Sequence, residues 1–275
     1  MLAATLLSLG AAVLHAGWNL AVKQSTFDRF IALWGQFLAA GTLAAIALVV
    51  GGGIPIAGYG WAALSGLAHI PYCVMLARAY TTGDFSVMYP IARGGGALLA
   101  GIGGVALLGD HIGPVGIVGM LVVTTGLGLL AGHTNRHQLG VAVSVSATIG
   151  TYTLCDAQGI RATDTPLYAA ATFVAIAIAT TSWGVATGRR VEMVAATRTL
   201  WRRFLLLGAA SAVTYTLVQM ALRLAAVGYV TCLRESSVVI AAFVGARFLG
   251  EGGLRRRVGA AVVVLVGLAL LIVGA

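Results

Sequence analysis

Apolar segments of about 20 residues recur along the whole chain and are separated by short breaks. A bilayer core roughly 30 Å thick needs a helix of about that length to cross it. The apolar runs are continuous and do not alternate with polar residues, so they exclude the strands of a membrane barrel. We therefore predict an all-α polytopic membrane protein with ten transmembrane helices. The expected spans are 2–22, 30–50, 59–80, 85–108, 112–132, 139–158, 166–187, 204–225, 229–249 and 257–275.

Composition agrees with a lipid environment. Of 275 residues, 59% are hydrophobic and only 9% are charged, which leaves too few polar groups to cover a surface that faces water. The lipid bilayer is therefore the expected partner of most of the surface. The net charge of +9 does not indicate a nucleic-acid partner, because no run of basic residues is interleaved with aromatic ones.

The two halves of the chain resemble each other. The stretch "ARAYTTGDFSVMYP" at 77–90 matches "LRLAAVGYVTCLRE" at 222–235, and "LLGD" ending at Asp110 matches "FLGE" ending at Glu251. These matches keep their order, which predicts two five-helix repeats, at 1–132 and 139–275. Because five is odd, the second repeat must be inverted in the membrane, and such repeats place a substrate site at their interface near mid-membrane.

Basic residues are distributed unequally between the two sides of these spans, with only Arg161 and Arg223 on one side and Arg93 and Arg234 inside the membrane. Cytoplasmic loops carry an excess of Lys and Arg, so the richer side is expected in the cytoplasm and both termini at the periplasm or exterior. The thirteen basic residues of the richer side are Lys23, Arg29, Arg78, Arg136, Arg189, Arg190, Arg198, Arg202, Arg203, Arg247, Arg255, Arg256 and Arg257.

Several motifs resemble the EamA family of the drug/metabolite transporter (DMT) superfamily. They are the two Leu-Gly-acid endings, "YPIARGGG" at 89–96, "HAGWN" at 15–19, "DAQGIR" at 156–161 and "RESSVV" at 234–239. The resemblance implies ten helices in two EamA repeats and a location in the bacterial inner membrane. It also implies a central cavity between helices one, three, four, six, eight and nine, as in YddG-like amino acid exporters. Their members are usually described with both termini in the cytoplasm, opposite to the charge-based expectation.

An ionisable residue within a span marks a functional site by default, since its burial in lipid is costly. Arg93, Arg234 and Glu235 are such residues, and Tyr89 and Pro90 correspond to Arg234 and Glu235 in the repeat. An arginine fork binds carboxylates and suits the acid end of an amino acid, while Glu235 could receive an ammonium group. The alternative is that an arginine only pairs with Glu235 and holds helices four and nine together.

Further candidates come from helices one, three, six and eight. A histidine near a carboxylate can carry a proton, which makes His15 and Asp156 the candidates for proton coupling. A purely structural hydrogen bond of His15 is the alternative. The other expected substrate-binding residues, each of which could instead be a packing residue, are Trp18, Asn19, Tyr72, Tyr152, Tyr215 and Gln219.

These observations predict a secondary transporter or facilitator that exports small metabolites, with amino acids favoured, by alternating access. No enzyme motif, metal-ligand spacing or nucleotide-binding loop occurs in the sequence, so no catalysis, cofactor or metal is expected. The alternatives are a membrane-embedded protein that modifies or translocates lipids, or a receptor subunit without transport. Substrate, energy coupling and the choice between monomer and homodimer stay open.

Overall fold

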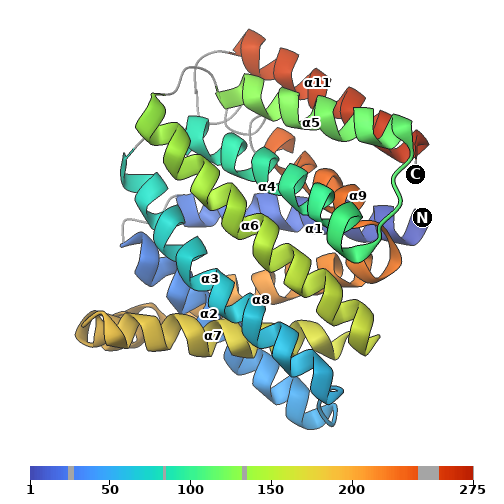
Figure 1. The fold of residues 1–275 in the computed structure, drawn as a ribbon. Helices are drawn as coiled ribbons and strands as arrows, with labels where there is room; N and C mark the ends of the chain where they lie inside the picture. The colour runs from blue at the N-terminus through green and yellow to red at the C-terminus, as the bar shows by residue number, and fades with distance from the viewer. Residues whose placement is uncertain (24–27, 83–84, 132–134, 241–253, 275) are drawn as a thin grey trace.

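The structure is a computed structural model, and it describes the backbone of residues 1–23, 28–82, 85–131, 135–240 and 254–274. Within these ranges the chain is all-helical, without a strand, and forms ten helices (Figure 1). They are α1 (Leu2–Lys23), α2 (Arg29–Val50), α3 (Ile56–Thr82), α4 (Phe85–Leu108), α5 (Pro114–Ala131), α6 (Arg136–Thr163), α7 (Leu167–Ala186), α8 (Arg190–Leu224), α9 (Val227–Arg234) and α11 (Leu254–Val273). The expected all-α class is confirmed.

The helices have the length and composition of a membrane-embedded protein. Among the described residues, α2, α7 and α8, with most of α3 and α4, are long and apolar enough to cross a membrane. Shorter apolar stretches lie in α1, α5 and α11. Large apolar side chains are exposed on the surface, as at Val50 and Ile56, where they can contact lipid.

Local sequence signals set the helix ends. Asp28 begins α2 by accepting a hydrogen bond from the amide of Ile31, and Asn135 begins α6 in a reciprocal capping box with Gln138. At the α7–α8 turn Gly188 has a φ of 79°, a left-handed conformation that favours glycine. The turn therefore closes tightly between two long helices.

Helix α8 is longer than the sequence predicted. It begins at Arg190, whereas the expected span began at 204. Met193, Leu200 and Phe204 all pack against one apolar core, at the spacing of a single helix face. The added turns are thus an amphipathic extension, which a search for continuous apolar runs does not detect.

Helix α9 is shorter than its expected span of 229–249. It ends at Arg234, Glu235 lies in a turn, and helical backbone resumes at 236–240. The remainder of that span lies outside the described residues.

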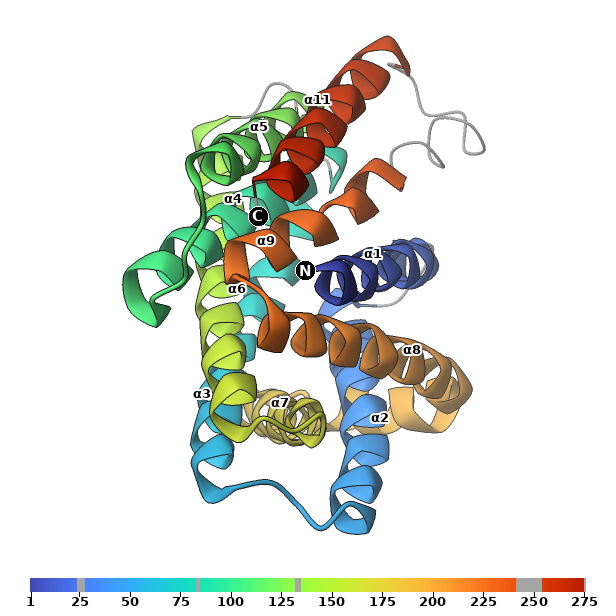
Figure 2. The ribbon, with the colours of Figure 1, turned by 90° about the vertical axis from the view of Figure 1, so that its right-hand side faces the viewer.

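Contacts between the two halves of the sequence build most of the bundle. Helix α6 packs on α3 and α4, α7 packs on α2 and α3, and α8 packs on α1 and α2 (Figure 2). Helices α5 and α11 form a close pair of their own along the side of the bundle (Figure 1). Helix α9 contacts α4 and α1, which brings Arg234 to the centre of the molecule.

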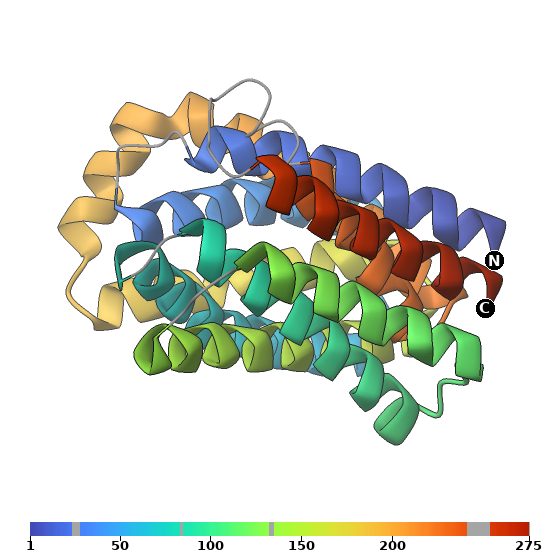
Figure 3. The same cartoon turned by 90° about the horizontal axis from the view of Figure 1, so that it is seen from above.

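Both termini lie at one end of the bundle and the α7–α8 turn lies at the other (Figure 3). The terminal end also holds the α4–α5 connection. The long helices between these two ends enclose the site described next.

Candidate functional site

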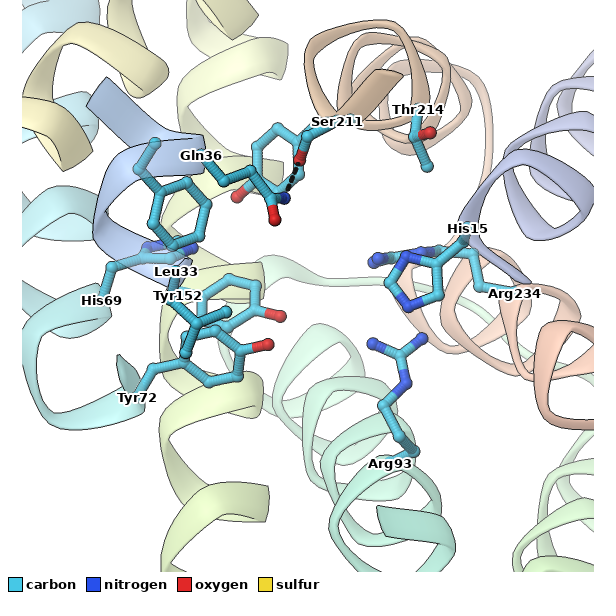
Figure 4. Close-up of a pocket in the computed structure, with 12 residues that line it drawn as sticks. His15, Leu33, Gln36, His69, Tyr72, Arg93, Tyr152, Ser211, Thr214 and Arg234 are labelled. Carbon is cyan, nitrogen blue, oxygen red and sulfur yellow. Dashed lines mark hydrogen bonds between the residues drawn. The ribbon is translucent and has the colours of Figure 1, made fainter. Parts of the chain in front are cut away.

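A small cavity lies in the middle of the bundle, with an internal volume of about 40 Å³ (Figure 4). Helices α1, α3, α4, α6, α8 and α9, the six that the family resemblance implied, all contribute to its wall, and α2 contributes as well. The lining residues are His15, Leu33, Gln36, Phe37, His69, Tyr72, Arg93, Tyr152, Ser211, Thr214, Tyr215 and Arg234.

Arg93 and Glu235 form a buried ion pair beside the cavity. Nε of Arg93 donates to Oε2 of Glu235 at 3.1 Å, and Nη2 lies 2.8 Å from Oε1. The two side chains are only 5% and 4% exposed. This two-point contact joins α4 to the turn after α9 and engages both carboxylate oxygens of Glu235.

Arg234 differs from Arg93 although both line the cavity. It is the last residue of α9 and is 7% exposed. Within the described ranges its guanidinium forms neither an ion pair with a carboxylate nor a hydrogen bond. A buried cation is costly unless it is paired, so this guanidinium is the group best suited to receive an anion.

His15 lies on the same side of the cavity as the two arginines (Figure 4). Its Nε2 is 3.1 Å from the hydroxyl of Tyr89, which connects α1 to α4. Tyr89 therefore contributes to the site through His15. Pro90, the next residue, is buried within α4 and does not line the cavity.

Aromatic rings make up the opposite wall. The imidazole of His69 stacks on Tyr152 with ring centres 4.2 Å apart, and Tyr72 meets Tyr152 edge-on at 5.5 Å. The Nδ1 atom of His69 lies 2.7 Å from the carbonyl oxygen of Ser65. Since a carbonyl only accepts, Nδ1 carries the hydrogen, and in the neutral ring Nε2 is left as an acceptor.

Gln36 adds a second acceptor. Its Nε2 donates to Oγ of Ser211 at 2.8 Å, whereas its buried Oε1 has no hydrogen-bond partner among the described residues. In Figure 4 this amide oxygen faces the open space across from the guanidinium groups. The cavity thus has cationic groups on one wall and neutral acceptors with aromatic rings on the other.

The two candidates for proton coupling are separated in the structure. His15 contacts Tyr89, whereas Asp156 is buried behind Tyr215, whose hydroxyl donates to Oδ2 of Asp156. Asp156 does not line the cavity, and it has no ion pair within the part of the chain that is described. Any exchange of protons between them would pass through other groups.

Three further residues that the sequence suggested are not among the residues that line the cavity. Gln219 is buried in α8, where its Nε2 donates to Oγ1 of Thr172 on α7 at 3.4 Å. Trp18 and Asn19 belong to α1, but their side chains lie outside the described residues.

The sequence analysis missed several lining residues, which are Gln36, His69, Ser211 and Thr214 and the apolar Leu33 and Phe37. A usable signal existed for two of them. His69 and Gln36 are polar residues inside apolar spans, the same signal that identified Arg93.

A network closes the terminal end of the bundle. Oδ2 of Asp110 accepts a hydrogen bond from the amide of Val227 at 2.7 Å, at the start of α9. Arg161 lies 2.8 Å from Oδ1 of Asp110 and also donates to the carbonyl oxygens of Leu222 and Ala225. Asp110 therefore serves a helix N-terminus. Its counterpart in the second repeat, Glu251, lies outside the described residues.

Within the described residues no group of three or more His, Cys, Asp or Glu side chains could hold a metal ion. No protein-family model and no curated protein matches the chain. A solved structure described as "Crystal structure of protein" is similar in fold, with a TM-score of 0.76 over 98% of each chain at 14% sequence identity. At that identity the likeness concerns the fold alone.

Proposed function

We propose that the protein is a secondary transporter or facilitator that exports small metabolites, chiefly amino acids, through the central cavity. The observation that carries this proposal is the buried guanidinium of Arg234, which faces the cavity and lacks a carboxylate partner within the described residues. A carboxylate of the substrate would supply that partner in a two-point contact.

The opposite wall favours a zwitterion over a simple anion. Oε1 of Gln36 and Nε2 of His69 can accept hydrogen bonds from an ammonium group, and the rings of Tyr72 and Tyr152 can attract it. An α-amino acid carries both charges on one carbon, so it can contact both walls of a narrow cavity at once.

Transport by alternating access requires this cavity to change size. Ligand sites usually measure about 300–1,000 Å³, whereas the cavity has about 40 Å³, room for only a few water molecules. The conformation described here corresponds to a closed state in the proposed cycle. Opening toward the terminal end would separate groups that the network of Arg161 and Asp110 holds together.

The helix contacts support two inverted five-helix repeats at 1–132 and 139–275. In such repeats each helix of the first half corresponds to the helix five places later, with α11 taken as the tenth helix. The contact between α3 and α6 then corresponds to the contact between α8 and α1, and the contact between α3 and α7 corresponds to that between α8 and α2. Both members of each pair occur, and the pairs α2–α7, α4–α9 and α5–α11 map onto themselves. This symmetry and the sequence motifs are the basis for proposing membership of the EamA family of the DMT superfamily.

The charge distribution supports a bacterial inner-membrane location with both termini outside. At the terminal end Arg161 pairs with Asp110 and Arg223 pairs with Asp164. The described arginines near the opposite end outnumber the described acids there, Asp28 and Glu192. These arginines are Arg29, Arg78, Arg136, Arg189, Arg190, Arg198, Arg202 and Arg203. An end rich in arginine is retained in the cytoplasm.

Counterflow in proteoliposomes tests the function. Vesicles that hold the purified protein and one unlabelled amino acid should take up the labelled form, and a panel of amino acids identifies the substrate. Arg234→Ala should reduce initial uptake at least tenfold, because removal of a charged hydrogen-bond partner costs about 1.5–3 kcal/mol. Arg234→Lys should retain part of the activity, since the charge remains and the fork is lost.

Arg136→Gln is the matched control, because it removes one positive charge from the exposed start of α6. It should leave uptake unchanged. Equal uptake by the wild type and Arg234→Ala would refute the substrate role of Arg234. Movement of labelled phospholipid between leaflets, without amino acid uptake, would instead favour lipid translocation.

A further inference from the structure

A second hollow lies between α2, α7 and the first turns of α8. Its volume is about 400 Å³, and it shares no lining residue with the central cavity. Trp34, Val185, Met193 and Val194 form its apolar part, and Arg190 and Arg198 lie beside them. The hollow is thus larger than the central cavity and has a different chemistry.

The apolar part can take hydrocarbon without leaving a polar group unsatisfied. Nε1 of Trp34 donates to Oγ1 of Thr181 at 2.9 Å, so the only donor of the indole is already used. Trp34 is 3% exposed and packs edge-on against Phe204, and Met193 is also 3% exposed. These fixed, buried side chains form a rigid apolar floor.

The two arginines of the hollow differ from their neighbour Arg189. Arg189 lies 2.9 Å from Asp28 and 2.8 Å from Glu192, and it covers the ring of Phe30. Arg190 and Arg198 are exposed and have no ion pair within the described residues. Their charge is therefore available to an anion from outside the protein.

The first turns of α8 have the pattern of a helix at a membrane surface. Met193, Leu200 and Phe204 face the protein core, while Val191 is 80% and Trp201 is 53% exposed. An amphipathic helix with arginines and an exposed tryptophan is typical of the boundary between headgroups and acyl chains. This segment lies at the end of the bundle opposite both termini (Figure 3).

We propose that the hollow between α2, α7 and α8 binds an anionic phospholipid, with an acyl chain on Trp34 and Met193 and the phosphate at Arg190 and Arg198. The two arginines are eight residues apart on one helix, about 12 Å along its axis, and both line the hollow, so their long side chains can reach one headgroup. A hollow of this kind at a basic membrane boundary favours anionic over neutral lipid. This inference does not depend on the transport function.

Lipid titration of the purified full-length protein in detergent tests the proposal. Phosphatidylglycerol should raise the melting temperature and should remain bound in native mass spectrometry, whereas phosphatidylcholine should do neither. Arg190→Gln with Arg198→Gln should weaken phosphatidylglycerol binding roughly 25-fold, because each arginine near an anionic lipid contributes about a factor of five. Val194→Trp should block binding while both arginines remain, since the larger ring fills the apolar part.

The matched control is Arg136→Gln with Arg202→Gln, which removes the same charge from exposed positions outside the hollow. The control should bind phosphatidylglycerol like the wild type. Equal weakening in both double variants would overturn the site in favour of general charge attraction. An equal response to phosphatidylcholine, or to inorganic phosphate alone, would also overturn it. If the first double variant does not fold, unchanged binding by Val194→Trp refutes the proposal by itself.

Discussion

At the scale of single residues, the centre of the bundle contains two arginines in different electrostatic situations. Arg93 is matched by Glu235 at two points, whereas Arg234 has no such partner within the described residues. Removing one member of a buried pair leaves an uncompensated charge, and removing both can be nearly neutral. The two arginines should therefore respond differently to substitution: Arg93 chiefly in stability, and Arg234 chiefly in the transport proposed above.

We expect Arg93→Met to lower the free energy of unfolding by about 3–5 kcal/mol, because Glu235 would stay buried without its partner. The double variant Arg93→Met with Glu235→Leu should recover more than half of that loss. Unfolding by denaturant in detergent micelles measures both values. A double variant no more stable than the single one would show that the pair is not the reason for the loss.

Sequence reasoning identified many of the cavity residues and could not decide their pairing. Arg93, Arg234, Tyr72, Tyr152 and Tyr215 were selected as polar or aromatic residues within apolar spans, and all five line the cavity. Which arginine meets Glu235 depends on side-chain directions around a helix end, and those follow from packing between distant parts of the chain. The position of His69 opposite the arginines likewise depends on how α3 meets α6.

At the scale of helices, glycines permit a close contact between α5 and α11. A Cβ atom added to Gly119 would lie 2.6 Å from the backbone nitrogen of Leu271, and one added to Gly267 would lie 2.6 Å from the nitrogen of Val123. The obstacle in each case is backbone, which cannot rotate away. Close backbone approach through small residues is the usual basis of helix association in lipid.

Gly119→Ala should therefore destabilise the protein by about 1–3 kcal/mol, the cost typical of overpacking. Gly128→Ala is the control in the same helix, because a Cβ atom at Gly128 would meet nothing within 4 Å. Thermal unfolding in detergent measures the difference. Similar melting temperatures for the two variants would contradict the close crossing of α5 and α11.

The helices themselves were largely predictable, with instructive exceptions. Continuous apolar runs predicted the ends of most helices to within a few residues. This works because a helix surrounded by lipid must be apolar along its whole length. The first turns of α8 were not predicted to be helical, because their apolar residues recur on one face of the helix only. The turn at Glu235 was not predicted, because Glu235 contacts Arg93, a residue far away in the sequence.

At the scale of the whole molecule, the two ends of the bundle differ in charge. The arginines at the terminal end, Arg161 and Arg223, each meet an aspartate, whereas Arg190 and Arg198 at the other end do not pair within the described residues. Moving unpaired arginines across a membrane opposes both insertion and the membrane potential. The end with the α7–α8 turn should therefore face the cytoplasm.

Fusions to the full-length chain test this orientation. Alkaline phosphatase at Ala275 should be active and green fluorescent protein at the same position should be dark, since only the former matures in the periplasm. The same reporters inserted at Gly188, in the α7–α8 turn, should give the reverse pattern. A fluorescent Ala275 fusion together with an inactive phosphatase would establish the orientation usual for EamA proteins.

The pair formed by Arg93 and Glu235 also bears on how the protein is made. The two residues are 142 positions apart, and a ribosome adds about 5–20 residues each second, so Arg93 is synthesised roughly 7–28 seconds before Glu235. A guanidinium at the centre of a bilayer costs about 2.5–3.5 kcal/mol during insertion. Until the ribosome has made Glu235, water or the insertion machinery must therefore solvate the guanidinium of Arg93. The order of synthesis thus sets when α4 reaches its final position in the bundle.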